Sequence, residues 1–225
     1  MSEEIKYFYL RNHPLLASLP ETKLAAVAAQ AKMRTVYRGE IISYGEPGYT
    51  KIHFLVKGKV KITDSAKENE MVKDILTEPD IFGDLGLEGV LKSDECAEAL
   101  TANTIICSFH VNDFKRILEE NPQLVLGYAR KVNSKLERLE NRHADLVFLD
   151  TKDRLIRFIK NWARTDGNNK GDKIVLNNYL THSDIAGFIA TSRQSVNMLL
   201  NELRSSGLLC YNRKQIELIN PMAWN

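Results

Sequence analysis

The sequence has little of several features that would define its class at once. It contains only three cysteines, Cys96, Cys107 and Cys210, whose odd number and wide spacing exclude a disulfide framework and a clustered metal site. It has no apolar run of about eighteen residues, so a membrane-spanning helix is not expected. Its first residues, MSEEIKYFYLRN, lack the basic and apolar regions of a secretory signal peptide. We therefore expect a cytoplasmic protein with no membrane partner and no predicted metal or cofactor.

Net charge is also small, but it is unevenly distributed. The whole chain of 225 residues carries a formal charge of +2. Residues 151–225 hold 11 Lys and Arg against 6 Asp and Glu, whereas residues 1–150 hold 20 against 23. A basic C-terminal third is the electrostatic pattern expected of a nucleic-acid-binding domain, although this excess is modest.

Residues 182–209, HSDIAGFIATSRQSVNMLLNELRSSGLL, predict two short helices separated by a tight turn. Thr181 and Ser192 are placed to cap the two helices, and Gly207 suits the residue just past the second. In the second helix, the apolar residues at i, i+3, i+4 and i+7 predict a core-facing stripe: Val196, Leu199, Leu200 and Leu203.

The rest of the second helix is polar, and two explanations of this surface are open. It is either an ordinary solvated face or a surface that reads base edges, because Arg and Gln can bond guanine and adenine in a major groove. The following GLLCYNRKQIELIN predicts two short strands around a basic tip, as in a winged helix, and this favours DNA. The predicted DNA-binding residues are Thr181, Ser192, Arg193, Gln194, Ser195, Asn197, Met198, Arg213 and Lys214.

A long helix is predicted over residues 122–149, with Pro122 at its first position. Its apolar residues recur with a period near 3.5, which is typical of a seam between paired helices. The alternative is a helix packed in its own core, but the narrow seam favours a homodimer. His143 is interpreted as a packed residue. The predicted seam consists of Val125, Tyr128, Val132, Leu136, Leu139, His143 and Leu146.

The first 120 residues contain many short alternating segments punctuated by glycine, after a helical patch at LPETKLAAVAAQAKM. Lys57 and Gly58 are predicted to turn one strand into the next as a hairpin. We therefore predict an α+β protein with three parts. They are an antiparallel β-roll sensor domain (1–120), a long dimerisation helix (121–149) and a winged helix-turn-helix domain (150–225).

The order of these elements resembles the cyclic AMP receptor protein/fumarate–nitrate reduction regulator (Crp/Fnr) family. The motifs IFGDLGL, LVFLD and SRQSV carry this resemblance, which covers nearly the whole chain. It implies a homodimeric bacterial transcription regulator that is not an enzyme. It also implies a cyclic-nucleotide-binding-like β-roll of the double-stranded β-helix type, with double-stranded DNA and RNA polymerase as partners.

The resemblance also predicts an effector pocket in which this sequence departs from the family. Where cyclic-nucleotide-binding members carry an Arg–Ser pair, this chain has Glu95 and Cys96, preceded by Asp94. An unpaired buried carboxylate would repel a phosphate, so we predict no tight cyclic AMP binding and leave the effector unknown. Asp84 could still bind a sugar hydroxyl. The backbone amides after Gly83 could still bind an anion at the N-terminus of a short helix. The predicted pocket residues are Gly83, Asp84, Leu85, Glu95, Cys96, Leu139 and Glu140.

The sequence excludes one other sensor type of the family and leaves another open. The iron–sulfur type needs an N-terminal cysteine cluster, and residues 1–90 contain no cysteine. Haem is left as an alternative, with His53, His110 or His143 as axial ligand, although a single histidine is more often structural.

The recognition helix also departs from the family. Gln194 replaces the usual Glu, Met198 replaces a second base-reading Arg, and Ala190 replaces the Gly of the turn. The family's usual half-site is therefore not assumed.

Two other function classes are considered. One is a nucleotide- or redox-sensing module that acts on a protein partner, with Cys96 and Cys107 facing each other across a hairpin. Two buried, unreactive thiols are the more frequent situation. The other is a cupin-like metalloenzyme, which would need several His and carboxylates converging on a metal. The five histidines are scattered, which disfavours it.

Overall fold

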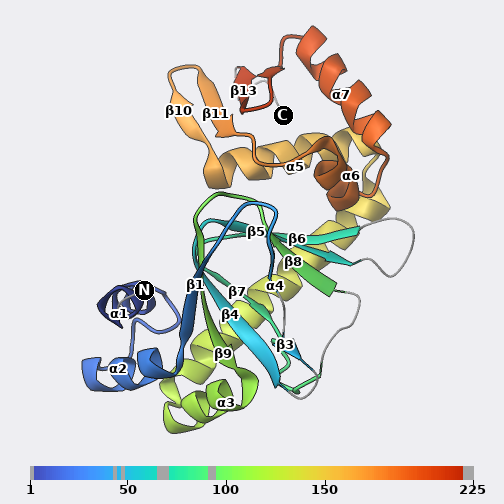
Figure 1. Ribbon diagram of the computed structural model, residues 1–225. Helices are drawn as coiled ribbons and strands as arrows, with labels where there is room; N and C mark the ends of the chain where they lie inside the picture. Colours follow the sequence, from blue (N-terminus) through green and yellow to red (C-terminus); the bar gives the residue numbers. More distant parts are fainter. Residues whose placement is uncertain (1–2, 43–44, 47–48, 65–70, 91–94, 220–225) are drawn as a thin grey trace. The chain divides into compact units, whose positions relative to one another are not determined.

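A computed structural model describes residues 3–42, 45–46, 49–64, 71–90 and 95–219 (Figure 1). Its contacts divide the chain into two compact units, Met1–Arg138 and Leu139–Asn225. The division falls inside the long helix α4 (Gln123–Phe148). The helix predicted over 122–149 is confirmed to within one residue at each end. The division into three domains stays a prediction.

Two antiparallel sheets form most of the first unit, which confirms the expected β-roll. One sheet has the strand order β1-β9-β4-β3 with β7 beside β4, and the other has the order β2-β8-β5-β6. The strands are β1 (Lys32–Val36), β2 (Ile41–Ile42), β3 (Gly45–Glu46), β4 (Tyr49–Lys57), β5 (Lys59–Asp64), β6 (Met71–Thr77), β7 (Asp80–Gly83), β8 (Glu95–Ala99) and β9 (Thr104–His110).

Strand β4 separates two apolar cores. Ile52 and Phe54 belong to a core between the first sheet and the helices. Leu55 belongs to a second core, which takes residues from both sheets, including Val60 and Phe82. Successive side chains of a strand point to opposite faces, so one strand supplies both cores. The helices over the first core are α1 (Glu3–Arg11), α2 (Glu21–Gln30), α3 (Val111–Glu120) and the first half of α4. Helix α1 was not expected from the sequence.

The predicted hairpin at Lys57 and Gly58 is wrong. Strand β4 pairs with β9 and β7, whereas β5 pairs with β6 and β8, so the chain passes from one sheet to the other at this point. Gly58 has φ +96°, and a Cβ there would lie 2.9 Å from the Thr104 Cα. A hairpin and a crossing between sheets both need a turn between two alternating strands, so the local pattern does not distinguish them.

His13 is buried in the first core, where burial outweighs a backbone hydrogen bond with Asp80 that favours protonation. It is 2% exposed, and its ring stands edge-on to Phe54 with centroids 4.8 Å apart. Burial, and secondarily the nearby Lys131, lower the pKa of His13 from 6.5 to about 4. The unfolded chain therefore binds more protons than the folded one between these two pH values, and stability falls as the pH falls through this window.

We expect His13 to remove about 2 kcal/mol from the free energy of unfolding between about pH 7 and pH 5. In His13→Asn the side-chain oxygen still accepts from the Leu15 amide, which lies 3.3 Å from His13 Nδ1, but the side chain does not titrate. Urea unfolding at both pH values measures this. Between them, the variant should lose about 2 kcal/mol less of its free energy of unfolding than wild type does. Equal losses in the two proteins would contradict the assignment.

The second unit contains a helix pair followed by a strand–tip–strand unit, as predicted. Two strands that the sequence did not predict, β10 and β11, join the last two in a sheet of order β10-β11-β13-β12. After the end of α4 the elements are α5 (Thr151–Asp166), β10 (Asn168–Lys170), β11 (Lys173–Asn177), α6 (His182–Ile189), α7 (Arg193–Ser205), β12 (Leu209–Tyr211) and β13 (Gln215–Ile219). None of the described helices is long and apolar enough to cross a bilayer.

Ala190, in the turn between α6 and α7, has φ 53° and ψ 63°, a left-handed conformation. An L-residue with a Cβ is strained there by about 1–2 kcal/mol, a cost that glycine avoids. We expect Ala190→Gly to raise the free energy of unfolding by about 1 kcal/mol, because glycine recovers most of that strain. Ala186→Gly, inside α6, is the control and should lower it by about as much. Denaturant unfolding of both variants measures this, and a destabilised Ala190→Gly would contradict it.

Candidate functional site

Helix α7 has one buried and one exposed face. Its buried face is the predicted apolar stripe of Val196, Leu199, Leu200 and Leu203. Arg193, Gln194 and Asn197 are exposed, and Met198 is 63% exposed. Within the described part of the chain, the side chains of Arg193, Gln194 and Asn197 make no hydrogen bond or ion pair. These polar groups are available to a partner.

The three hydroxyl residues of the predicted site are engaged in helix caps. Thr181 Oγ1 accepts a hydrogen bond from the Asp184 amide at 3.1 Å and donates to the Asp184 carboxylate at 2.7 Å. Ser192 Oγ accepts from the Ser195 amide at 3.0 Å, and the two serine hydroxyls lie 2.8 Å apart. Both predicted N-caps are therefore confirmed, and they determine where α6 and α7 begin.

The tip between β12 and β13 is a closed turn that presents two cations. Asn212 Oδ1 accepts hydrogen bonds from the Lys214 amide at 2.7 Å and the Gln215 amide at 2.9 Å. The Asn178 side chain donates to the Asn212 carbonyl at 3.2 Å. Arg213 and Lys214 are exposed on this turn. Asn212 was not among the predicted site residues, although asparagine commonly organises turns by accepting hydrogen bonds from the amides that follow it.

His182 was also missed, since no local pattern marks it. It begins α6, and its ring centroid lies 5.8 Å from that of Tyr211 at the start of the wing. Burial, and then the positive charge of Arg193, lower the pKa of His182. Both effects favour the neutral form of this imidazole.

The turn after β7 differs from the short helix start that was predicted to receive an anion. Residues 84–90, the described stretch that follows Gly83, contain no helix. The Asp84 carboxylate accepts from the Gly89 amide at 2.7 Å and from Thr50 Oγ1 at 3.1 Å, so it is committed to its own loop. The Leu85 carbonyl accepts from the Tyr128 hydroxyl at 2.6 Å. The amides expected to receive an anion are in part already used by Asp84.

Glu95 was expected to be an unpaired carboxylate, and this is wrong. Lys73 Nζ lies 2.7 Å from Glu95 and 3.0 Å from Asp64, so one ammonium joins three strands. Burial opposes its charge, but the hydrogen bonds that Lys73 donates to the two carboxylates outweigh this and raise the pKa of Lys73. No local sequence pattern indicates this pair, because Lys73 and Glu95 are 22 residues apart. Asp94 lies outside the described residues.

The residues predicted to form one effector pocket lie in different compact units. Those on the β-roll belong to the first unit, whereas Leu139 and Glu140 are exposed residues of the second. Their grouping stays a prediction. Among the described residues, no group of three or more His, Cys, Asp and Glu is arranged to hold a metal ion.

The cysteines do not face each other across a hairpin as the redox hypothesis required. Cys96 lies on β8 and Cys107 on β9, which belong to different sheets. Cys107 is fully buried, and burial raises the pKa of its thiol to about 12. Cys96 Sγ lies 3.1 Å from Thr63 Oγ1. The reactive thiolate of Cys107 is therefore scarce at neutral pH.

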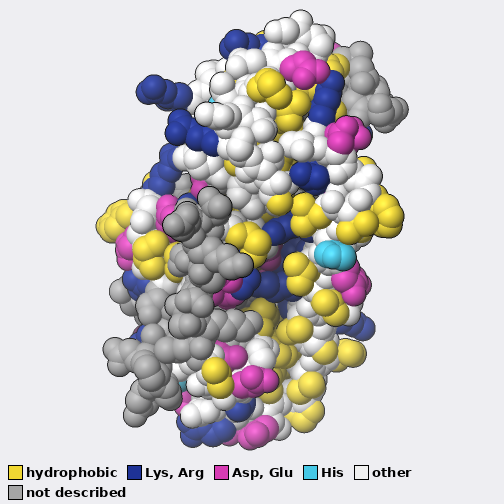
Figure 2. All heavy atoms as spheres, turned by 90° about the vertical axis from the view of Figure 1, so that its right-hand side faces the viewer, with side chains coloured by type: hydrophobic (Ala, Val, Ile, Leu, Met, Phe, Trp, Pro, Cys, Tyr) yellow, Lys and Arg dark blue, Asp and Glu magenta, His cyan; other side chains and the backbone are white. Residues whose placement is uncertain are grey.

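Helix α4 carries many exposed apolar side chains, and Figure 2 shows one face of the molecule on which hydrophobic side chains are exposed. Among the predicted seam residues, Val125 is 47%, Leu136 51% and Leu139 58% exposed. His143 is exposed as well. The large exposed apolar residues of α4 are Val125, Leu126, Leu136, Leu139, Leu146, Val147 and Phe148.

Two predicted seam residues are turned toward the first unit's own core. Tyr128 is 8% exposed and its ring centroid lies 5.5 Å from that of Phe114. Val132 is partly buried against the same core. The outer face of α4 at the level of Tyr128 is therefore formed by other residues, such as the exposed Ala129.

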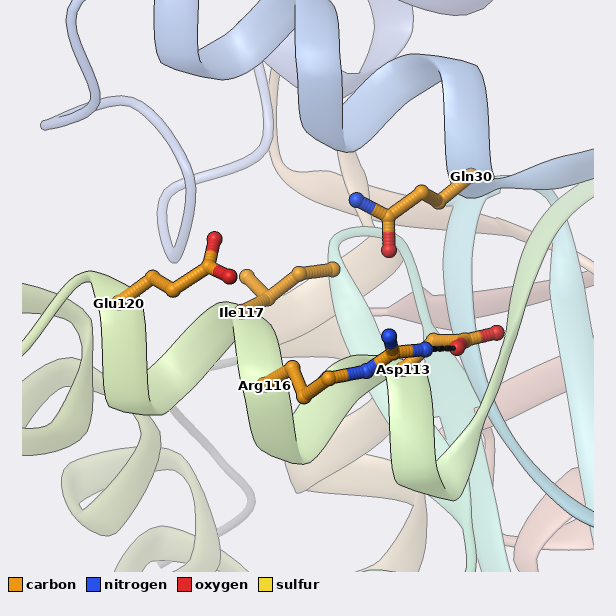
Figure 3. A pocket seen from close by; sticks show the side chains of 5 residues that line it. All are labelled: Gln30, Asp113, Arg116, Ile117 and Glu120. Atoms are coloured by element: carbon orange, nitrogen blue, oxygen red, sulfur yellow. Dashed lines mark hydrogen bonds and ion pairs between the residues drawn. The ribbon is translucent and has the colours of Figure 1, made fainter.

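A polar hollow of about 280 Å³ lies between the end of α2 and helix α3 (Figure 3). Asp113 and Arg116 form an ion pair within it, and the other lining residues are Gln30, Ile117 and Glu120. No residue of the predicted DNA-binding or effector sites lines this hollow.

Comparison with known proteins identifies relatives of both units. A family model described as a Crp-like helix-turn-helix domain matches residues 153–223. The chain is 29% identical over 189 residues to a global nitrogen regulator of Synechococcus elongatus, covering 83% of this chain and 85% of that protein. It is 25% identical to a CRP-like cAMP-activated global transcriptional regulator of Mycobacterium tuberculosis, covering 86% of each.

Solved structures show the same fold. A CooA mutant from Carboxydothermus hydrogenoformans superposes with a TM-score of 0.73 at 22% identity and covers 88% of each chain. At this coverage the similarity includes residues of both compact units. Residues 153–223 thus match a Crp-like helix-turn-helix domain, and most of the chain is similar to DNA-binding transcription regulators of the Crp/Fnr type.

Proposed function

We propose that the protein reads pseudo-palindromic double-stranded DNA as a homodimer, with one α7 helix in each of two successive major grooves. The exposed face of α7 carries this proposal. Its polar groups lack partners within the described chain, while the opposite face is fully committed to the core. Such a helix is held rigidly and offers its hydrogen-bonding capacity outward, which is what groove recognition needs.

The side chains of α7 have different roles in this proposal. Arg193 forms a bidentate contact with a guanine, and Gln194 and Asn197 supply amides that match adenine. Met198 makes an apolar contact, such as that with a thymine methyl group. The hydroxyl residues at the capped N-termini of α6 and α7 approach the phosphate backbone. They are Thr181, Ser192 and Ser195.

The wing supplies contacts that do not depend on sequence. Arg213 and Lys214 are exposed on a turn that Asn212 holds closed. Their charges neutralise phosphates, which raises affinity for all duplexes and makes it dependent on salt.

The homodimer forms along α4. Leu136 and Leu139 are more than half exposed, and with Val125, His143 and Leu146 they repeat at the spacing of a helix-pairing seam. Pairing of the α4 helices gives a dimer with two-fold symmetry. Its two α7 helices bind DNA half-sites that lie about 34 Å apart. The effector, whatever its identity, acts by favouring one of two dimer geometries, since a ligand shifts only states that it binds unequally.

Cyclic AMP is not the effector in this proposal. The cation that could receive its phosphate, Lys73, already bridges the carboxylates of Glu95 and Asp64, and these three groups together carry net negative charge. Calorimetric titration with cyclic AMP should therefore show no binding at micromolar concentrations. Heat that fits a micromolar or tighter site would overturn this part of the proposal.

The regulator changes transcription from its DNA site and contacts RNA polymerase there, without an enzymatic activity of its own. Selection of duplexes from a random library by the purified full chain is the test of the proposal. We expect a two-fold symmetric sequence with half-sites one helical turn apart. Enrichment of no sequence would contradict it and would favour a sensing module that acts on a protein partner.

A further inference from the structure

Arg154, near the start of α5, binds carbonyl groups from segments far apart in the sequence. Its Nε donates to the Ile189 carbonyl at 2.9 Å, and its Nη1 donates to the Leu149 carbonyl at 2.9 Å. Its Nη2 lies 3.4 Å from both the Ala190 carbonyl and Thr151 Oγ1. One guanidinium thus joins the end of α4, the first turn of α5 and the end of α6. All these residues belong to the second unit.

The carbonyls at Ile189 and Ala190 belong to the corner of the helix-turn-helix. The last carbonyls of a helix lack partners inside it and carry partial negative charge, so a cation is favourable there. Ala190 is the left-handed residue at which the chain turns, and α7 begins three residues later at Arg193. Arg154 therefore binds the carbonyls of the two peptide units that flank the Ala190 Cα, at the corner between α6 and α7.

Arg154 also contacts the residue that follows α4, through its hydrogen bond to the Leu149 carbonyl. Leu149 directly follows α4, the helix that carries the exposed apolar face. Two further contacts join the same segments, since Asp145 pairs with Arg157 of α5, and Arg142 lies 4.8 Å from the centre of the Phe188 ring in α6. Arg154 is distinct from these in contacting the corner itself.

We propose that Arg154 is a positioning residue that transmits the direction of α4 to the recognition helix, and so determines which half-site spacing the dimer accepts. The inference depends on the proposed dimeric DNA binding. The role needs the planar, multi-donor guanidinium, because a lysine ammonium is a compact point charge that cannot serve the same spread of acceptors. Arg154 itself need not touch DNA for this role.

The test compares wild type with Arg154→Lys on the operator selected by the wild-type chain. Each protein is titrated against that operator, against versions with one base pair inserted or removed between the half-sites, and against random duplex. Wild type should bind the altered spacings about tenfold more weakly than the selected one. Arg154→Lys should bind the selected operator about tenfold more weakly and should lose most of the discrimination between spacings.

Two comparisons separate positioning from general effects. Lys152→Met removes a cation from the same turn of α5, where Lys152 pairs with Glu202 of α7 without contacting the corner, and it should keep the spacing preference. The fraction of competent dimer is determined by stoichiometric titration, so a loss of folded protein does not imitate a loss of discrimination. Affinity for random duplex and its salt dependence should be the same in all three proteins.

The inference is overturned if Arg154→Lys keeps the wild-type spacing discrimination, whether or not it binds all DNA more weakly. A uniform loss on every duplex would make Arg154 a phosphate-binding or merely stabilising residue. If the wild-type chain itself selects no sequence, the proposed function fails and the inference fails with it.

Discussion

Replacing both Leu136 and Leu139 by glutamate should convert the dimer to a monomer and lower affinity for the selected operator about 10²–10⁴-fold. Both side chains are more than half exposed within one chain, so the substitutions leave the monomer's core intact. In a paired helix they would place like charges in an apolar seam, where an unpaired carboxylate is strongly disfavoured. A monomer then holds only one half-site and loses the gain from binding two at once.

Leu126→Glu is the matched control for this experiment. Leu126 is 60% exposed on the same helix, but it lies next to Val125 in sequence and therefore about 100° around the helix from the seam. Sedimentation velocity should show a dimer for wild type and Leu126→Glu, and a monomer for the double variant. A double variant that stays dimeric would contradict the assignment of the dimer interface to α4. Equal dissociation of Leu126→Glu would contradict it as well.

Arg193→Ala should cost about 1–3 kcal/mol of binding free energy at the selected operator and much less on random duplex. Arg193 is exposed at the first position of α7 and has no recorded hydrogen bond or ion pair within the described chain. Its removal therefore deletes a contact with DNA without breaking one inside the protein. The preference for one base at the contacted position should become weaker as well.

Arg213→Ala is the comparison that gives this result its meaning. Arg213 is an exposed cation on the wing, so its loss should weaken binding to all sequences and reduce the slope of log K against log salt by about 1. Gel-shift titrations at several salt concentrations distinguish the two patterns. If Arg193→Ala behaves as Arg213→Ala does, Arg193 neutralises phosphate and does not read a base.

Much of the second unit could be predicted because its signals are local. The apolar stripe at Val196, Leu199, Leu200 and Leu203, the caps at Thr181 and Ser192 and the left-handed Gly207 are each formed within a few residues of the chain. The length of α4 follows from the same kind of pattern.

Predictions of which residues face one another were less successful, for a physical reason. A periodic pattern states that a side chain is buried but not what buries it. Tyr128 fits the helix-pairing period, yet it packs in its own unit's core. Strands β4 and β5 alternate as a hairpin would, yet they belong to opposite sheets.

Most kinds of element, the buried face of α7 and the resemblance to the family follow from local sequence, because periodicity, capping and motif order act over short stretches of chain. Packing was needed to show that Lys73 neutralises Glu95, that Asp84 occupies amides of its own loop, and that Arg154 joins the residue after α4 to the turn before α7. Each of these contacts involves a choice among many possible partners. The packing of sheets and helices determines which partners meet, and the local pattern of residues does not predict it.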